Sequence, residues 1–359
     1  MALANNAVWR TLQGSKNFSS PVTIAEAIEQ ANTNYNVVGE PLVRMPQEIL
    51  NALINGEMPN LDWFNQNRII ETHKATVRDD ADMTLGIVGQ KYGIVQNEKA
   101  FEFIDFITGG SINGQRPIIE TVGILNGGAR MFVTAKMPTE MYINGDNSDP
   151  IEDYILFTNT HDGSGAVMAF FTPLRVICQN TLNAAIRNCQ NKLCFKHSLN
   201  VNQRLDLANK DNLNKATKVL EMHDKFKVEF IQQLQHLASQ RINATDIDRF
   251  VTHTLVDNAQ MVSLIEDSGF KYEQIEELPS RTLNRIYALK NSIESGIGQD
   301  KNRGTKLWLY NGITTYFQND TDYITDKAND DEKKMQSLIL DGGTHLKKVQ
   351  NAYNYLMSA

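Results

Sequence analysis

Alternating apolar and polar positions predict a β-rich middle to this chain. From residue 68 to residue 78, Ile69, Ala75 and Val77 alternate with polar neighbours, which is the period-two pattern of a strand. Further strands are predicted at residues 85–89, 92–95, 118–125, 131–137, 154–158, 166–171 and 192–197. Turns rich in Gly, Asn and Asp separate two of these pairs, at 126–128 and 162–165, and they favour hairpins.

Helical spacing of apolar residues predicts helices on both sides of these strands. Thr23 and Glu26 form a possible capping box for a helix ending near residue 31, and Asn97 caps a second helix that Gly109 and Gly110 end. Other helices are predicted at residues 174–187, 199–237, 245–256, 281–295 and 304–317. We expect residues 1–20 to be loose, residues 35–67 to be irregular and residues 320–332 to form an acidic loop.

The order of these elements predicts an α+β fold. Its antiparallel β-rich core precedes a mostly helical C-terminal half, which is not the regular alternation of a βαβ protein. We divide the chain into an N-terminal helix and irregular segment (1–66), an α+β core (67–200), a helical region packing on it (201–320), and an acidic loop with a C-terminal helix (321–359).

Composition and charge narrow the class of protein. Of the 359 residues, 41% are hydrophobic and 21% are charged, which excludes a fully disordered or fibrous chain. The three cysteines are too few for a secreted disulfide scaffold. The start of the chain shows no signal peptide and no apolar stretch suggests a membrane span, so we expect a cytoplasmic protein without membrane contact.

Charge is unevenly distributed along the chain. The net charge is −7, but residues 175–227 hold ten Lys or Arg against four Asp or Glu, a local balance of +6 that leaves −13 elsewhere. A lysine-rich solvated helix face explains this, and so does a polyanion partner. Aromatic residues near such a surface can stack on unpaired bases, and Tyr92, Tyr154 and Phe195 are candidates, although each is also typical of a core.

Motifs for catalysis or metal binding are weak. Cys178, Cys189, Cys194 and His197 lack the spacing of a zinc knuckle, and no P-loop is present. His161 and Asp162 are adjacent in the string HDGS, which a hairpin turn explains without chemistry, and a binding role is favoured over a catalytic one. We expect no metal, no cofactor and no enzymatic activity.

Four strings together resemble a known family. They are LGIVGQKYGIVQN (85–97), HDGS (161–164), PLRVICQNTL (173–182) and GTKLWLYNGITTY (304–316). Their order and spacing resemble the phage- and plasmid-like family called domain of unknown function 932, over about residues 60–320. The resemblance implies a role in handling phage or plasmid DNA. One concrete version is a single-strand annealing protein, of which some resemble the Rad52 fold, need no nucleotide and form rings.

These considerations favour an ATP-independent protein that binds or anneals single-stranded DNA in recombination or replication and forms homo-oligomers. Cations would neutralise phosphates along a groove, while amide side chains near Arg175 would donate hydrogen bonds or simply cap the sheet. The predicted binding residues are Arg78, Lys91, Tyr92, Arg130, His161, Arg175, Gln179, Asn180, Arg187, Lys192 and Lys196. The alternatives are an inhibitor that binds a host defence complex and, less favoured, a metal-dependent nuclease.

Overall fold

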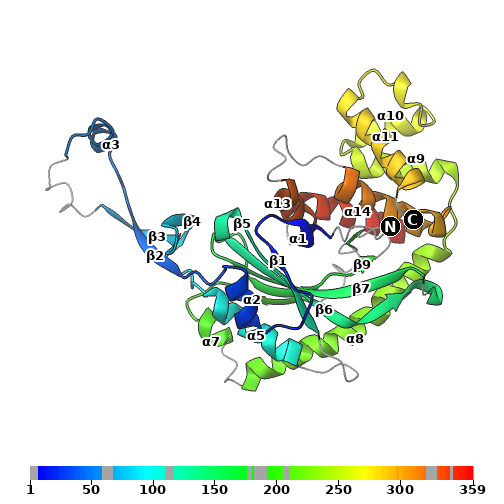
Figure 1. Cartoon of the computed structure of the whole chain (residues 1–359). Coiled ribbons are helices and arrows are strands. Elements are labelled where there is room, and N and C mark those ends of the chain that lie inside the picture. Colours follow the sequence, from blue (N-terminus) through cyan, green and yellow to red (C-terminus); the bar gives the residue numbers. More distant parts are fainter. Residues whose placement is uncertain are drawn as a thin grey trace.

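The computed structural model describes residues 7–58, 68–109, 117–146, 148–175, 180–181, 192–205, 210–296, 298–320, 330–339 and 343–358. Within these residues, a large antiparallel sheet is flanked by helices, and a narrow arm projects from one side (Figure 1). The described part of the chain is therefore an α+β protein whose C-terminal half is helical, as the sequence predicts.

The large sheet has the strand order β1-β5-β6-β7-β8-β11, with β9 paired to β7 and β10 paired to β9. The bounds are β1 Lys16–Asn17, β5 Ile118–Leu125, β6 Arg130–Tyr142, β7 Pro150–Thr160, β8 Val167–Phe171, β9 Leu174–Arg175, β10 Asn180–Thr181 and β11 Lys192–Phe195. Asn126 and Gly127 both have positive φ at the β5–β6 turn, which explains why these residue types occupy it. The predicted hairpins are confirmed, and β6 and β7 extend beyond their predicted bounds.

Helices cover both faces of this sheet. The long helix α8 (Lys210–Ser239) and helix α5 (Asn97–Gly109) lie along one face, and α1 (Val8–Thr11) lies on the other (Figure 1). Successive residues of β7 show the two faces, because Asp153 hydrogen-bonds to His223 of α8 whereas Tyr154 contacts Arg10 of α1. The predicted capping box also forms, since Thr23 and Glu26 bond reciprocally at the start of α2 (Ile24–Gln30).

The C-terminal helices pack together beyond the sheet. Their bounds are α9 Ala244–Leu255, α10 Ala259–Asp267, α11 Ser280–Ser295, α12 Lys306–Thr315, α13 Asp330–Lys334 and α14 Thr344–Ser358, whereas the short helix α7 (Val201–Leu205) contacts α5 and β11. Every residue of α12 from Leu307 to Thr315 is buried, and Gly312 lets this helix approach Ile293 of α11. None of the described helices combines the length and the apolar character that a membrane span requires.

The projecting arm is built from residues 37–58 and 68–89. Strands β2 (Val37–Val43), β3 (Ile69–Arg78) and β4 (Met83–Gly89) form a separate antiparallel sheet, and helix α3 (Gln47–Ile54) lies at its far end (Figure 1). A small cluster of Tyr35, Val37, Leu85 and Ala129 joins the base of the arm to the body. The prediction of an irregular segment over 35–67 is wrong for β2 and α3.

Four further predictions differ from the structure. Residues 92–95 do not form a strand, and β9 and β10 replace parts of the helix predicted over 174–187. The helix predicted over 199–237 is two helices, α7 and α8. The N-terminal segment is not loose, because residues 7–12 contribute Val8, Trp9 and Leu12 to the main hydrophobic core.

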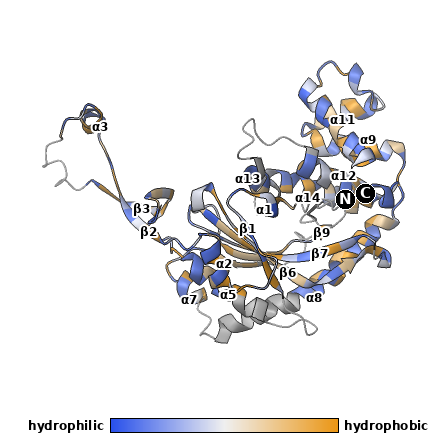
Figure 2. Ribbon diagram, in the orientation of Figure 1, coloured by the Kyte–Doolittle hydropathy of each residue, from blue (hydrophilic) through white to orange (hydrophobic). Residues whose placement is uncertain are grey.

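The main hydrophobic core contains residues from position 7 to position 356 of the chain. It includes residues of the central strands, which are largely coloured as hydrophobic in Figure 2.

Candidate functional site

The HDGS string forms the turn that follows β7. The carboxylate of Asp162 accepts hydrogen bonds from the backbone N–H of Ser164 at 2.9 Å and from its hydroxyl at 2.6 Å. Gly163 adopts φ of 78°, a conformation that glycine favours. Asp162 is therefore the acceptor that closes a tight turn, and the turn accounts for the Asp-Gly-Ser sequence.

His161 is completely buried beneath this turn. Its Nε2 lies 3.0 Å from Oδ1 of Asn97, which also accepts a hydrogen bond from Nδ2 of Asn159 at 3.0 Å. Burial, and secondarily the nearby His197, lowers the pKa of His161 to about 4, so the ring is neutral at pH 7. A buried neutral imidazole cannot reach a phosphate, and His161 instead fixes the start of α5 against β7.

The 85–97 string packs directly on this turn. A Cβ on Gly86 would lie 2.5 Å from Cα of Asp162, and one on Gly93 would lie 2.2 Å from the carbonyl oxygen of Ser198. Both glycines are thus required for close backbone contact. Two of the four strings, far apart in the sequence, meet at this end of β7.

An aromatic pair lies at the same end of the sheet. The Tyr92 hydroxyl donates to the carbonyl of Thr160 at 2.6 Å, and its ring stacks on His197 with centroids 4.6 Å apart and planes inclined by 14°. Burial lowers the pKa of His197, which favours the neutral ring. Both residues are partly buried, and Nε2 of His197 is fully buried.

Two exposed lysines flank this pair in the sequence. Lys91 precedes Tyr92 and Lys196 precedes His197, and neither lysine forms an ion pair with a described residue. We refer to Lys91, Tyr92, Lys196 and His197 as the lysine–aromatic patch. The stacking of the two rings brings their two loops together, and one exposed lysine precedes each ring in the sequence.

Two of the predicted arginines, Arg130 and Arg78, lie near this patch, and their side chains have different partners. Arg130 of β6 is half-buried, stands opposite Thr160, and donates to the Ser164 hydroxyl at 3.0 Å. Arg78 of β3 pairs with Asp80 at 2.6 Å and donates to the Gly127 carbonyl at 3.0 Å. The charge of Arg78 is therefore neutralised locally, whereas Arg130 borders the turn.

The other predicted residues belong elsewhere. The backbone of Arg175 pairs with Ile151 and with Asn180, at the far end of β7 and about 30 Å from the lysine–aromatic patch by strand length. Lys192 begins β11 opposite Phe170. Gln179 and Arg187, together with Cys178 and Cys189, lie outside the described residues. The eleven predicted residues thus do not all gather in one place.

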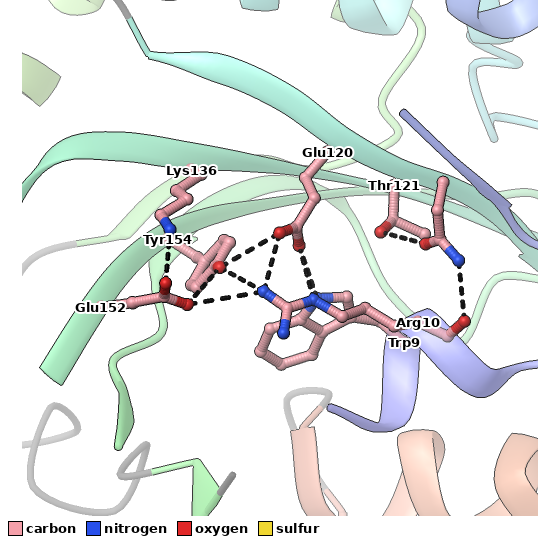
Figure 3. A network of polar contacts seen from close by, with 8 residues as sticks. Trp9, Arg10, Glu120, Thr121, Lys136, Glu152 and Tyr154 are labelled. Carbon is pink, nitrogen blue, oxygen red and sulfur yellow. Dashed lines mark hydrogen bonds and ion pairs between the residues drawn. The ribbon is translucent and has the colours of Figure 1, made fainter. Parts of the chain in front are cut away.

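The far end of β7 brings together the other two strings. Strand β9 of the 173–182 string pairs with Glu152 and Ile151, and β10 contacts helix α12 of the 304–316 string. On the adjacent sheet face, Arg10 donates to Glu120 at 2.7 and 3.1 Å and lies 3.5 Å from Glu152 (Figure 3). Sequence analysis missed this network because the first twenty residues were expected to be loose.

Charge is balanced within this network. The carboxylates of Glu120 and Glu152 face the cations of Arg10 and Lys136, and the Tyr154 hydroxyl donates to Glu152 at 2.7 Å (Figure 3). Although burial opposes ionisation of Glu152, hydrogen bonds from Lys136 and Tyr154 hold its pKa below the ordinary value. Ionised, paired carboxylates of this kind hold α1 to the sheet and are poor general bases.

Comparison with known proteins gives one match. The model of the family described as Domain of unknown function (DUF932) matches residues 84–339, which is 256 of the 359 residues. The lysine–aromatic patch and all four strings lie inside this range. No curated protein and no solved structure matches the chain significantly.

Proposed function

We propose that this chain, which belongs to the DUF932 family, binds single-stranded nucleic acid without ATP and acts in annealing for a phage or other mobile element. The observation that carries the proposal is the lysine–aromatic patch. Two exposed lysines without a carboxylate partner among the described residues flank two stacked, partly buried aromatic residues at one end of an antiparallel sheet.

The patch combines the two interactions that single strands offer. Lysine neutralises phosphates and releases counterions, which gives affinity without sequence preference. An aromatic face stacks on an unpaired base, and this interaction contributes about 1–3 kcal/mol per base. Arg130 lies next to the turn, where it donates to the Ser164 hydroxyl.

Because the whole molecule is negatively charged, the proposed nucleic-acid contact is confined to this patch. The net charge is −7, so a polynucleotide is not attracted to the surface in general. Asp162 lies close enough to Tyr92 and His197 to influence their pKa values, and it sets one boundary of the patch. We therefore expect modest affinity from each copy, with several copies along a strand giving tighter binding.

A titration of labelled oligonucleotides with the full chain tests the proposal. Fluorescence anisotropy would follow a single strand and a duplex of the same length at about 50 and 200 mM salt. We expect preference for the single strand and a loss of roughly tenfold in affinity between the two salt concentrations. Absence of binding at the lower salt, or affinity that does not change with salt, would contradict the proposal and favour a protein-binding role.

A further inference from the structure

The arm carries most of the exposed large apolar side chains of the described chain. Eleven of the seventeen such residues lie in its segments 37–58 and 68–89. Eight of them cluster in the outer half of the arm, which we define as residues 43–58 and 68–70. They are Val43, Met45, Leu50, Leu53, Ile54, Met58, Ile69 and Ile70.

Helix α3 has an apolar face that nothing described covers. None of its eight residues is buried, although Leu50, Leu53 and Ile54 follow the i, i+3, i+4 spacing of one helix face. An isolated helix of this length is marginal in water, and helices normally gain stability by burying such a face. Within the described residues, the side chains of this face therefore lack the packing partner that an amphipathic helix normally has.

Both faces of the strand leading back from α3 are also open. Ile69 and Ile70 are neighbours on β3 and point to opposite faces, yet they are 54% and 39% exposed. Val43 stands opposite Ile69 in the β2–β3 ladder and is 49% exposed. A flat partner surface can cover one face of this ribbon, whereas a second ribbon that crosses it can cover both.

The outer half of the arm has no net charge. It contains two arginines and two glutamates, Arg44, Arg68, Glu48 and Glu57. Polynucleotides and anionic membranes attract surfaces rich in Lys and Arg, so a neutral surface suits neither. Two copies of a neutral surface can approach without mutual repulsion.

The exposed apolar residues suit a dimer interface. The eight residues are 39–88% exposed, so a second copy packed against them would bury apolar surface toward the roughly 800 Å² that each partner buries in a standard interface. The largest apolar patch on a typical monomer is about 300–600 Å². From these exposed apolar residues, the neutrality and the two open faces, we propose that the outer halves of two arms clasp each other and join two copies of this chain.

The clasp does not depend on the proposed nucleic-acid function. It uses no residue of the lysine–aromatic patch, and it forms between copies without any ligand. An isologous contact of this kind buries the same side chains on both copies and closes on itself. The dimer would carry two lysine–aromatic patches, one on each body.

Mass measurement on nuclease-treated full-length protein tests the clasp. Light scattering after size exclusion should give twice the chain mass of 40.5 kDa for the natural sequence. The variant Leu50→Glu/Leu53→Glu/Ile54→Glu should give one chain mass, because three carboxylates per copy would be buried against each other. Glutamate favours helix, so the circular dichroism spectrum and melting temperature should remain those of the natural protein.

A matched variant elsewhere provides the control. Leu199→Glu/Val228→Glu/Leu264→Glu also places three carboxylates at exposed apolar positions but should retain the dimer mass. A natural protein with the mass of one chain would overturn the inference, even if it gains mass with an oligonucleotide or binds vesicles. So would an α3 variant that keeps the dimer mass while remaining folded.

Discussion

At the residue scale, the turn between β7 and β8 shows how a functional-looking string can be structural. HDGS suggests a site, but Asp162 closes the turn and His161 is buried on Asn97. Neither side chain is aimed at a partner. What the string does is to give the loops of Tyr92 and His197 a rigid support, so that the lysine–aromatic patch sits on fixed backbone.

Burial of His161 predicts a dependence of stability on pH. The pKa of His161 is lowered from 6.5 to about 4 in the folded protein, so unfolding takes up a proton between these values. The contribution of His161 to the free energy of unfolding is therefore present in full above pH 6.5 and is lost as the pH falls toward 4. The total loss is roughly 3 kcal/mol. Urea unfolding of the natural protein and His161→Gln at pH 7.5 and 4.5 measures this.

The comparison between the two proteins isolates the histidine. Glutamine can still donate to Asn97 but does not titrate, so the stability advantage of the natural protein should shrink as the pH falls. An advantage that stays constant between the two pH values would show that the burial of His161 is not linked to proton uptake.

Two glycines of β4 offer a second test at this scale. A Cβ on Gly86 would overlap the backbone of Asp162, whereas a Cβ on Gly89 would meet nothing within 4 Å. We expect Gly86→Ala to lower the free energy of unfolding by about 1–3 kcal/mol or more, and Gly89→Ala to change it little. Chemical denaturation measures both variants, and equal effects would contradict the close contact between β4 and the turn.

At the element scale, a buried polar pair anchors helix α8 to the sheet. Asp153 of β7 and His223 of α8 are hydrogen-bonded and both side chains are completely buried. Apolar packing lies beside this pair, since Phe226 stacks on Phe171 with centroids 5.3 Å apart. The pair therefore fixes the position of α8 along β7 in a way that apolar packing alone does not.

Removal of one member of this pair should be costly. Asp153→Ala leaves a buried polar partner, and we expect a loss of about 3–5 kcal/mol in the free energy of unfolding. Asp257→Ala is the control, because its contact with Lys348 is at the surface and contributes about 0–1 kcal/mol. Urea denaturation followed by circular dichroism compares them, and similar losses for both variants would rule out the anchoring role.

Elements with local signals could be predicted from the sequence, and elements fixed by distant contacts could not. The β5–β6 hairpin follows from Asn126 and Gly127, whose positive φ the turn requires. Pro41 suggested an irregular segment, but it lies in β2, an edge strand that tolerates its missing N–H. The loop at 92–95 is apolar like a strand, yet contacts with Thr160 and His197 hold it in another conformation.

The candidate site could be predicted only in part, for the same reason. Lys91, Tyr92 and Lys196 were identified from charge and aromatic character, and the structure brings their two loops together. His197 was considered only as a zinc ligand, because nothing in the sequence shows that it stacks on a residue about a hundred positions away. The network around Arg10 depends on contacts more than a hundred residues apart, which no local pattern reveals.

At the scale of the whole molecule, the structure separates two surfaces. Tyr92 of the lysine–aromatic patch contacts the end of β7, whereas helix α3, with its exposed apolar residues, lies at the far end of the arm (Figure 1). If the arm joins copies, avidity along a strand can compensate for the small number of cations that each copy offers. The acidic surplus elsewhere would then keep duplex and nonspecific contacts weak.

The central claim is that the lysine–aromatic patch contacts phosphates, and the salt dependence of single-strand binding tests it most directly. Removing two phosphate contacts with Lys91→Ala/Lys196→Ala should reduce the slope of log affinity against log salt by about 1.4. Lys271→Ala/Lys347→Ala removes two exposed lysines elsewhere and should leave the slope unchanged. Equal slopes for the natural protein and the Lys91/Lys196 variant would contradict the account.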